Sequence, residues 1–191
     1  MKARVVEADT RWEEEGLAWA RRVRDVLGER VLDIDHVGST AVPGLPAKDV
    51  LDIQALAYDL DQAQGAIAAL KQAGFAFEAG KRGEAPRPGY PDHPDCWDRL
   101  LFRGPRDERA TTLHLREVNT AGARVTLLLR DFLRADDLAR DQYGALKLGL
   151  ARHVDSERAY QALKAPLVAV TLRLAESWAE RTRWRLGQSD A

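Results

Sequence analysis

The sequence is poor in cysteine, has no excess of charge of either sign and contains no long apolar run. Its one cysteine, Cys96, excludes an intramolecular disulfide and a zinc site built from cysteines. The 29 basic side chains are matched by 30 acidic ones, which leaves a formal net charge of −1. A general nucleic-acid binder usually carries a basic excess, because counterion release from phosphates supplies most of its affinity. We therefore expect no general binding to nucleic acid.

The apolar residues form no membrane or export signal. No run approaches the ~20 apolar residues that a membrane span needs, and residues 1–16 lack the apolar core of a secretory signal. We expect a cytoplasmic protein that does not enter a membrane. With 191 residues, 45% of them hydrophobic, the chain predicts one domain over 1–191 that is stable without disulfides.

The apolar pattern predicts strands in the first two thirds of the chain and helices in the last third. Thr10 and Glu13 form a capping-box pattern before a first helix that runs to Leu27, and Gly28 is a natural terminator. The expected apolar stripe of this helix is Trp12, Leu17, Ala20, Val23 and Leu27. Strands are predicted over residues 31–37, 48–56, 75–78, 96–103 and 111–118, the last two as antiparallel neighbours. Further helices are predicted over residues 61–73, 121–134, 136–152 and 156–180.

This segregation of strands and helices indicates an α+β fold with a mixed sheet, one face covered and the other partly open for a site. The expected parts are an α/β core to about residue 120, C-terminal helices over 121–180 and a frayed tail over 181–191. Residues 79–95, with four prolines and three glycines, predict an irregular loop that is either part of a site or a mobile crossing. Pro166 is expected to kink the last helix or to mark a restart.

One segment carries most of the functional information: DIDHVGSTAVPGLPAKDVLDI, residues 33–53. It predicts a strand, a Gly-Ser turn, an irregular loop and a second strand with a carboxylate. Gly38 lets the backbone approach a ligand, while Ser39 and Thr40 offer hydroxyls and the amides of a helical turn. Such a turn beside a carboxylate suits a nucleoside triphosphate with Mg²⁺. A structural turn with a capping serine is the alternative, and the glycine and lysine spacing fits neither a Walker A loop nor a Rossmann fingerprint.

The same segment, in DHVGSTAVPGLPAK followed by LDI, resembles the signature of the GrpB family, which is placed in the nucleotidyltransferase superfamily with the polymerase-beta-like fold. Thr112-Leu113-His114-Leu115 resembles a family strand that usually reads His-x-His. LRDFLR at residues 129–134 and QYGALK at residues 142–147 resemble the family's helical half. The resemblance covers residues 8–175 in the same order. It implies a nucleotidyltransferase-like mixed sheet followed by a C-terminal helical layer.

Nucleotidyl transfer needs metal ions, usually two held by carboxylates, to neutralise the developing charge. In the superfamily, two acids at alternate positions of one strand do this, with a third acid from a neighbouring strand. Here Asp49 and Asp52 are three residues apart, which puts them on opposite faces of a regular strand. The family commonly has proline in place of Asp49, so the resemblance assigns the catalytic and metal-binding role to Asp52. A buried acid that caps the Gly38–Thr40 turn is the structural alternative.

The neighbouring strand offers His114, on the same face as Thr112 and Arg116, to complete a coordination shell or to assist as an acid or base. Thr112 stands where the family usually has its first histidine, which weakens a His-x-His metal grip. A packed strand histidine is the alternative for His114. Arg99 and Arg103 share one face of their strand and could reach phosphate oxygens.

The remaining expected phosphate ligands are basic residues. We expect Lys48 and Arg103 to offset phosphate charge, and Arg130 and Lys147 to close the pocket from the helical side. For Lys48 the alternative is a solvated strand-entry residue, for Arg103 an exposed edge-strand charge, and for Arg130 a salt bridge on a helix surface.

These residues lead to three hypotheses. The first is metal-dependent transfer of a nucleotidyl group from a nucleoside triphosphate, with Mg²⁺, to an unknown small-molecule or protein acceptor. The second is a catalytically inactive domain on the same fold that binds a nucleotide or coenzyme or has a regulatory role. The occurrence of the family fused to dephospho-CoA kinase favours this hypothesis. The third is a hydrolase of phosphorylated small molecules that uses one metal. The sequence leaves open whether turnover occurs and whether the chain forms a homodimer.

Overall fold

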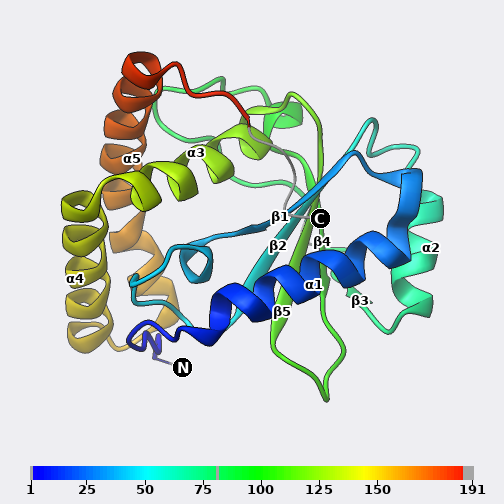
Figure 1. Ribbon diagram of the computed structural model, residues 1–191, viewed down its shortest axis with the longest axis horizontal. Helices are drawn as coiled ribbons and strands as arrows, with labels where there is room; N and C mark the ends of the chain where they lie inside the picture. Colours follow the sequence, from blue (N-terminus) through cyan, green and yellow to red (C-terminus); the bar gives the residue numbers. More distant parts are fainter. Residues whose placement is uncertain (1, 81, 187–191) are drawn as a thin grey trace.

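The computed structural model describes residues 2–80 and 82–186, which form a mixed five-stranded sheet with helices on both of its faces (Figure 1). The strands are β1 (Asp33–Val37), β2 (Leu51–Ala57), β3 (Ala76–Phe77), β4 (Arg99–Arg103) and β5 (Thr111–Glu117). The helices are α1 (Arg11–Leu27), α2 (Gln64–Gln72), α3 (Ala121–Ala135), α4 (Asp137–His153) and α5 (Glu157–Thr182). The predicted α+β class is confirmed.

The strand order is β1-β2-β5-β4-β3, with β2 and β5 parallel and the other pairs antiparallel. The predicted antiparallel pairing of the last two strands is therefore confirmed. The register places Asp52 opposite Val37 on one side and opposite Thr112 on the other, while Gln54 lies opposite His114. Because side chains alternate between the faces of a strand, Asp52, Gln54, Thr112 and His114 all project from the same face of the sheet.

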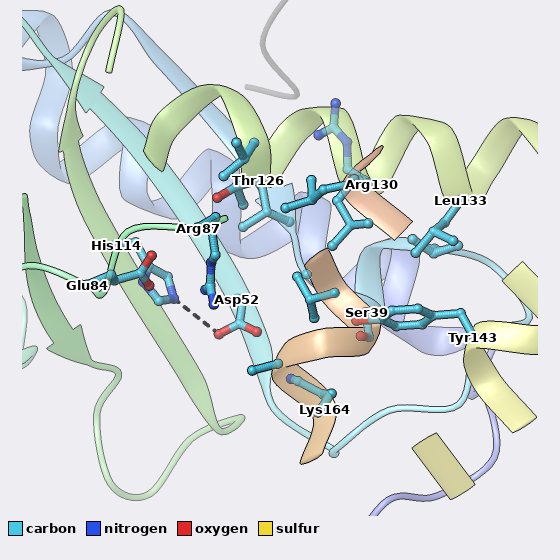
Figure 2. A pocket seen from close by; sticks show the side chains of 18 of the residues that line it. Ser39, Asp52, Glu84, Arg87, His114, Thr126, Arg130, Leu133, Tyr143 and Lys164 are labelled. Carbon is cyan, nitrogen blue, oxygen red and sulfur yellow. Dashed lines mark hydrogen bonds and ion pairs between the residues drawn. The ribbon is translucent and has the colours of Figure 1, made fainter. Parts of the chain in front are cut away.

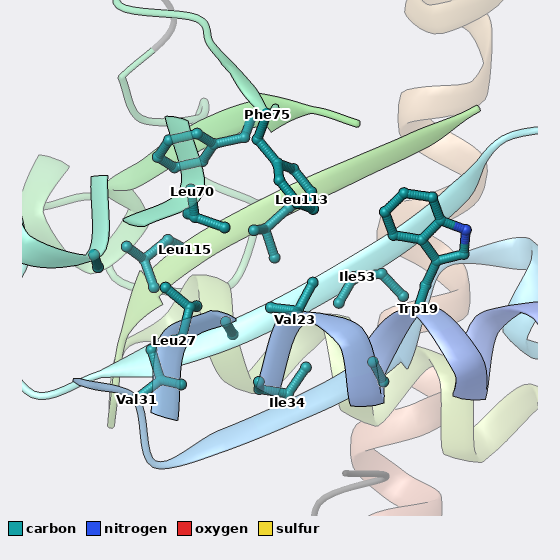
Figure 3. Packing of buried hydrophobic residues seen from close by; sticks show 14 of the residues in the cluster. Trp19, Val23, Leu27, Val31, Ile34, Ile53, Leu70, Phe75, Leu113 and Leu115 are labelled. Atoms are coloured by element: carbon teal, nitrogen blue, oxygen red, sulfur yellow. The ribbon is translucent and has the colours of Figure 1, made fainter. Parts of the chain in front are cut away.

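Helices α1 and α2 cover the opposite face, where they enclose the larger hydrophobic core with residues such as Val23, Leu70, Ile53 and Leu113 (Figure 3). A second core joins α3, α4 and α5 with Leu45 of the loop that precedes β2. In Figure 1 these three helices form a separate group beside the sheet. The face that carries Asp52 is thus only partly covered, which leaves room for a site.

The start of α1 differs from the prediction. Thr10 occupies the N-cap position in a helical conformation and makes no side-chain capping bond, so the predicted capping box is wrong. Asp9 accepts a hydrogen bond from the amide of Arg11 instead, at 2.9 Å. The buried stripe contains Trp19 rather than Leu17, because Trp19 continues the seven-residue spacing from Trp12 and Leu17 falls to the side of that face.

At the other end of the chain, α5 continues without interruption through the exposed Pro166, so the predicted restart does not occur. The helix ends at Thr182, and residues 187–191 of the expected frayed tail lie outside the described residues. No helix in the described part of the chain is long and apolar enough to cross a membrane.

Candidate functional site

The turn after β1 lies directly against Asp52. Gly38 has a φ of +74°, and residues Ser39–Ala41 then form one turn of 3₁₀ helix. A Cβ atom at Gly38 would lie 2.8 Å from Oδ2 of Asp52. Glycine is required here for two reasons: the backbone conformation disfavours other residues, and a side chain would collide with the carboxylate. The Gly-Ser turn and the strand acid therefore converge, as the sequence predicts.

Asp52 belongs to a chain of three hydrogen-bonded side chains on neighbouring strands. Nε2 of His114 lies 3.3 Å from Oδ1 of Asp52, and Nδ1 of His114 lies 2.8 Å from a guanidinium nitrogen of Arg99. Arginine only donates hydrogen bonds, so Nδ1 must be the acceptor and carries no proton. The proton of a neutral imidazole is then on Nε2 and is donated to Asp52. Both ring nitrogens of His114 are thus engaged.

The second acid of a metal-binding pair is missing from this face. Asp49 precedes β2 and points away, where it accepts a hydrogen bond from Nε1 of Trp12 at 2.8 Å and pairs with Arg109. Gln54, two residues after Asp52 on the same face, is fully buried, and its amide donates to the carbonyl oxygen of Ala123 in α3. The described residues contain no group of three or more histidine, cysteine or acidic side chains that could hold a metal ion.

Ser39 is held by a buried lysine from the helical part of the chain. Nζ of Lys147, on α4, lies 2.7 Å from Oγ of Ser39 and 2.6 Å from the carbonyl oxygen of Pro46. Burial, followed by repulsion from Lys164 and Lys48, lowers the pKa of Lys147 to about 7. The sequence singled out Lys147 as a possible phosphate ligand, and the structure brings it to the Gly-Ser turn.

Two hollows meet at this turn, one of about 270 Å³ and one of about 350 Å³. We call them together the cleft. Both are lined by Ser39, Asp52, His114, Gln161 and Lys164. The first, the apolar lobe, is lined further by Val42, Val125, Leu129, Leu133, Tyr143, Val168 and Leu172. The second, the polar lobe, is lined further by Lys48, Arg99, Arg103, Lys147, Glu157 and Tyr160. Figure 2 shows Glu84, Arg87 and His114 on one side of Asp52, with Leu133 and Tyr143 across the cavity.

The other predicted phosphate ligands also lie on the cleft, though several have partners of their own. Lys48 pairs with Glu157 of α5 and lies over the ring of Tyr160. Arg103 donates to Oγ1 of Thr112 at 2.6 Å. The hydroxyl of Thr40, which lines the polar lobe, is 3.0 Å from Nε2 of the buried His36.

Arg130 is almost fully buried at the edge of the apolar lobe. Its guanidinium donates to Asp35 at 3.1 Å, to the carbonyl oxygen of His36 at 3.0 Å and to Asp131 at 2.7 Å. These bonds join α3 to β1. Arg130 therefore forms salt bridges, as the alternative drawn from the sequence expects. Its bridge to Asp35 is buried rather than on the surface of the helix.

Several cleft residues were not identified as site residues from the sequence. Glu84 lies in the Pro- and Gly-rich loop and pairs with Arg99 and Arg116, the latter at 3.0 Å. Burial raises the pKa of Glu84, but the charges of Arg116 and Arg99 outweigh this effect and hold the pKa below its ordinary value. Arg87 of the same loop and Lys164 of α5 also line the apolar lobe. For Arg116 the signal was its position two residues after His114 on the same face. For Glu84 and Arg87 it was the irregular loop over residues 79–95, expected to be part of a site or a mobile crossing, whereas Lys164 gave no signal.

Comparisons with known proteins bear on the family and the fold. The sequence model of one protein family, described as GrpB protein, matches residues 2–173. A protein of Mycolicibacterium paratuberculosis named dephospho-CoA kinase is 32% identical over 95% of this chain and 48% of its own length. The chain thus spans about half the length of that curated relative.

Two solved structures resemble the fold. The crystal structure of the conserved protein GrpB from Enterococcus faecalis superposes with a TM-score of 0.73 at 24% identity, covering 92% of this chain and 99% of that one. Cid1 in complex with the UTP analogue UMPNPP superposes with a TM-score of 0.50 at 15% identity, covering 75% of this chain and 41% of that one. The fold is nucleotidyltransferase-like, as the resemblance of the sequence implies.

Proposed function

This chain belongs to the GrpB family, and from that premise we propose that it binds a nucleoside triphosphate in the cleft and transfers the nucleotidyl group to an acceptor. One observation carries the proposal: Ser39 and Asp52, from separate strand ends, line the same cavity together with Lys147 and Lys164. This cavity combines a glycine turn, a carboxylate and several cations. Such a combination suits a metal-bound triphosphate. We propose a cytoplasmic location, where nucleoside triphosphates are available.

In this proposal the polar lobe receives the phosphates. Lys48, Arg103 and Lys147 line it, and each can donate hydrogen bonds to phosphate oxygens. Ser39 offers its hydroxyl at the junction of the two lobes. Because Lys147 already donates to that hydroxyl, the lysine also fixes the orientation of Ser39. The task of these side chains is to bind and position the triphosphate.

The residues present fit one magnesium ion rather than a pair. Mg²⁺ is commonly bound through one or two carboxylates together with substrate phosphates and water. Asp52 supplies one such carboxylate: its Oδ1 accepts from His114, and its Oδ2 faces the Gly-Ser turn. When bound, the ion would neutralise charge that develops on the phosphates. His114 holds Asp52 in place by donating to it, which makes His114 a positioning residue in this scheme.

A second candidate function is a nucleotide- or coenzyme-binding domain without chemistry. The observation that favours it is the missing acid pair. Asp49 points away from the cleft, and the alternate position after Asp52 holds the buried Gln54 beneath α3. The match to a protein named dephospho-CoA kinase that is about twice as long is compatible with such a supporting role.

Calorimetric titration with a non-hydrolysable nucleoside triphosphate, with and without Mg²⁺, tests binding. We expect Asp52→Asn to weaken the Mg²⁺-dependent affinity by about tenfold or more, which corresponds to about 1.4 kcal/mol. Asp49→Asn is the matched control, since it makes the same chemical change three residues away outside the cleft, and its affinity should equal that of the wild type. Wild-type affinity in both Asp52→Asn and Ser39→Ala would refute the proposal.

Turnover separates the two candidate functions. A transferase incubated with α-labelled nucleoside triphosphate, Mg²⁺ and a cell lysate labels an acceptor and releases pyrophosphate, and Asp52→Asn should abolish both signals. A binding domain gives neither signal although it binds the nucleotide. Binding without label or pyrophosphate therefore supports the second candidate and contradicts the first.

A further inference from the structure

The apolar lobe of the cleft suits an aliphatic group better than a nucleobase. The part of its wall on α3 and α5 carries branched aliphatic side chains, among them Leu129, Leu133 and Val168. The hydroxyl of Thr126, which also faces the lobe, already donates to the carbonyl oxygen of Gly122 at 2.8 Å. A nucleobase needs polar partners along its edge, because unmatched polar atoms are costly to bury. The polar side chains that line the lobe include several charges, such as Asp52, Arg87 and Lys164, and its volume of about 270 Å³ suits a small molecule.

The same lobe is also lined by cations. Arg116 is 3% exposed, and its Nε and one terminal nitrogen have no hydrogen-bond partner among the described residues. Only its other terminal nitrogen is paired, with Glu84 at 3.0 Å. Arg87 and Lys164 also line this lobe. A lobe that is lined by these three cations suits an anionic group.

His114 is not in position to deprotonate a neutral acceptor. Nδ1 of His114 accepts from Arg99, and Nε2 donates to Asp52, so neither nitrogen is available to take a proton. An alcohol or a protonated amine must lose a proton when it attacks phosphorus, whereas a carboxylate is already ionised at neutral pH. A carboxylate acceptor therefore needs no proton transfer to His114.

We propose that the acceptor is a small carboxylic acid with an aliphatic body, its body in the apolar lobe and its carboxylate against Arg87, Arg116 and Lys164. This inference rests on the proposed transfer function and names its substrate class. In the reaction a carboxylate oxygen forms a bond to the α-phosphorus of the nucleoside triphosphate. The bond from that phosphorus to the bridging oxygen of the β-phosphate breaks, and pyrophosphate leaves with the electron pair. The products are an acyl nucleotide anhydride and pyrophosphate, and no proton is transferred.

Binding of the acid is tested first, without nucleotide. The probe is 4-methylpentanoate, with 4-methylpentan-1-ol as the uncharged analogue, followed by ligand-observed NMR and calorimetry. The acid should bind and the alcohol should bind at least about tenfold more weakly, because only the acid pairs with the arginines. Equal binding of the two, or no binding of the acid, overturns the proposal.

Two pairs of variants locate the bound acid. Leu129→Trp fills the lobe and should weaken binding of the acid by about tenfold. Leu138→Trp, on the exposed face of α4, should leave binding of the acid unchanged. Arg87→Met should weaken binding of the acid. Arg82→Met in the same loop should leave it unchanged, because Arg82 pairs with Asp61 and Asp98 outside the cleft. If each control weakens binding as much as its partner, the acid binds elsewhere and the assignment is wrong.

Turnover then tests the reaction. The wild-type protein with ATP, Mg²⁺ and 4-methylpentanoate should release pyrophosphate and, with hydroxylamine present, form the acyl hydroxamate. A protein that binds nucleotide but neither binds nor activates the acid overturns this inference and leaves the proposed nucleotide binding intact. A protein that binds the acid but no nucleotide overturns the proposed function and the transfer step with it.

Discussion

Nζ of Lys147 lies 2.7 Å from Oγ of Ser39, so a helix in the last third of the chain is bonded to the turn that follows the first strand. The same nitrogen bonds the carbonyl oxygen of Pro46 and thereby ties together both ends of the loop between Ser39 and β2. Lys147 is only 3% exposed, so this bond is made in a largely dry environment. The loop that would contact phosphate is thus shaped by a buried amine.

The buried amine of Lys147 predicts a pH dependence of stability. Burial is the main reason that its pKa falls from 10.5 to about 7 in the folded protein. Between these two values the unfolded chain binds more protons than the folded one, so the free energy of unfolding rises with pH. Relative to Lys147→Met, the wild type should gain about 1 kcal/mol per pH unit between pH 7 and 9. Urea unfolding at pH 7, 8 and 9 measures the difference.

Lys71→Met is the matched control, because Lys71 is an exposed lysine on α2. The stability of this variant should follow the wild type in parallel across the same pH range. Identical slopes for the wild type and Lys147→Met would mean that Lys147 is charged in the folded protein throughout, contrary to the prediction.

Replacement of Gly38 should damage both stability and the site. Gly38→Ala forces an alanine into a φ of +74° and places its Cβ 2.8 Å from Oδ2 of Asp52. We expect a loss of about 2–3 kcal/mol in the free energy of unfolding, of which about 1 kcal/mol is the backbone term. Gly28→Ala isolates that term, since Gly28 has a φ of +54° and no described atom lies within 4 Å of its Cβ position. Equal losses in the two variants would contradict the predicted contact with Asp52.

Two glycines of α4 should respond to alanine with opposite signs. At Gly144 a Cβ would lie 2.8 Å from the ring of Pro46, whereas at Gly149 it would meet no described atom within 4 Å. Alanine inside a helix is favoured over glycine by about 0.5–1 kcal/mol, so Gly149→Ala should stabilise the protein by that amount. Gly144→Ala should destabilise it, because α4 would be pushed off the loop that leads to β2. Chemical denaturation of both variants measures the free energy of unfolding. If both substitutions stabilise the protein, the packing of α4 tolerates a methyl group at Gly144, contrary to the prediction.

The hydrogen bonds of two histidines predict opposite neutral tautomers. His114 should carry its proton on Nε2, since Nδ1 accepts from Arg99. His153 should carry its proton on Nδ1, which lies 2.8 Å from the carbonyl oxygen of Gly149. Long-range ¹H–¹⁵N NMR at pH above 8 distinguishes the two forms by their nitrogen shifts. An Nδ1-protonated His114 would contradict the pairing with Arg99 and would return Nε2 as a possible base or metal ligand.

Much of the fold follows from local signals in the sequence. The periodicity of apolar residues gave the order and type of the main helices and strands, and the spacing of Asp49 and Asp52 correctly put them on opposite sides. The errors are also local in origin. Thr10 has the right residue type for a cap, but Asp9 provides the hydrogen bond, because several polar residues compete at a helix start.

The cleft was predictable only in part. Gly38, Ser39 and Asp52 stand in one contiguous motif, and the structure brings them together. Glu84 lies in a loop whose pattern left open a site or a mobile crossing, and Lys164 lies in a segment whose pattern indicates only a helix. Their positions depend on how that segment packs against the sheet.

The sequence by itself determined the elements, the glycine turn and the single acid beside it, since all of these depend on neighbours within a few residues. Only the tertiary structure decided which charges share the cavity. Parallel pairing of β2 with β5 puts His114 beside Asp52, and packing of α4 brings Lys147 to Ser39. The physical reason is that these contacts join segments far apart in the chain, and burial and charge pairing between such segments leave no periodicity in the sequence of either one.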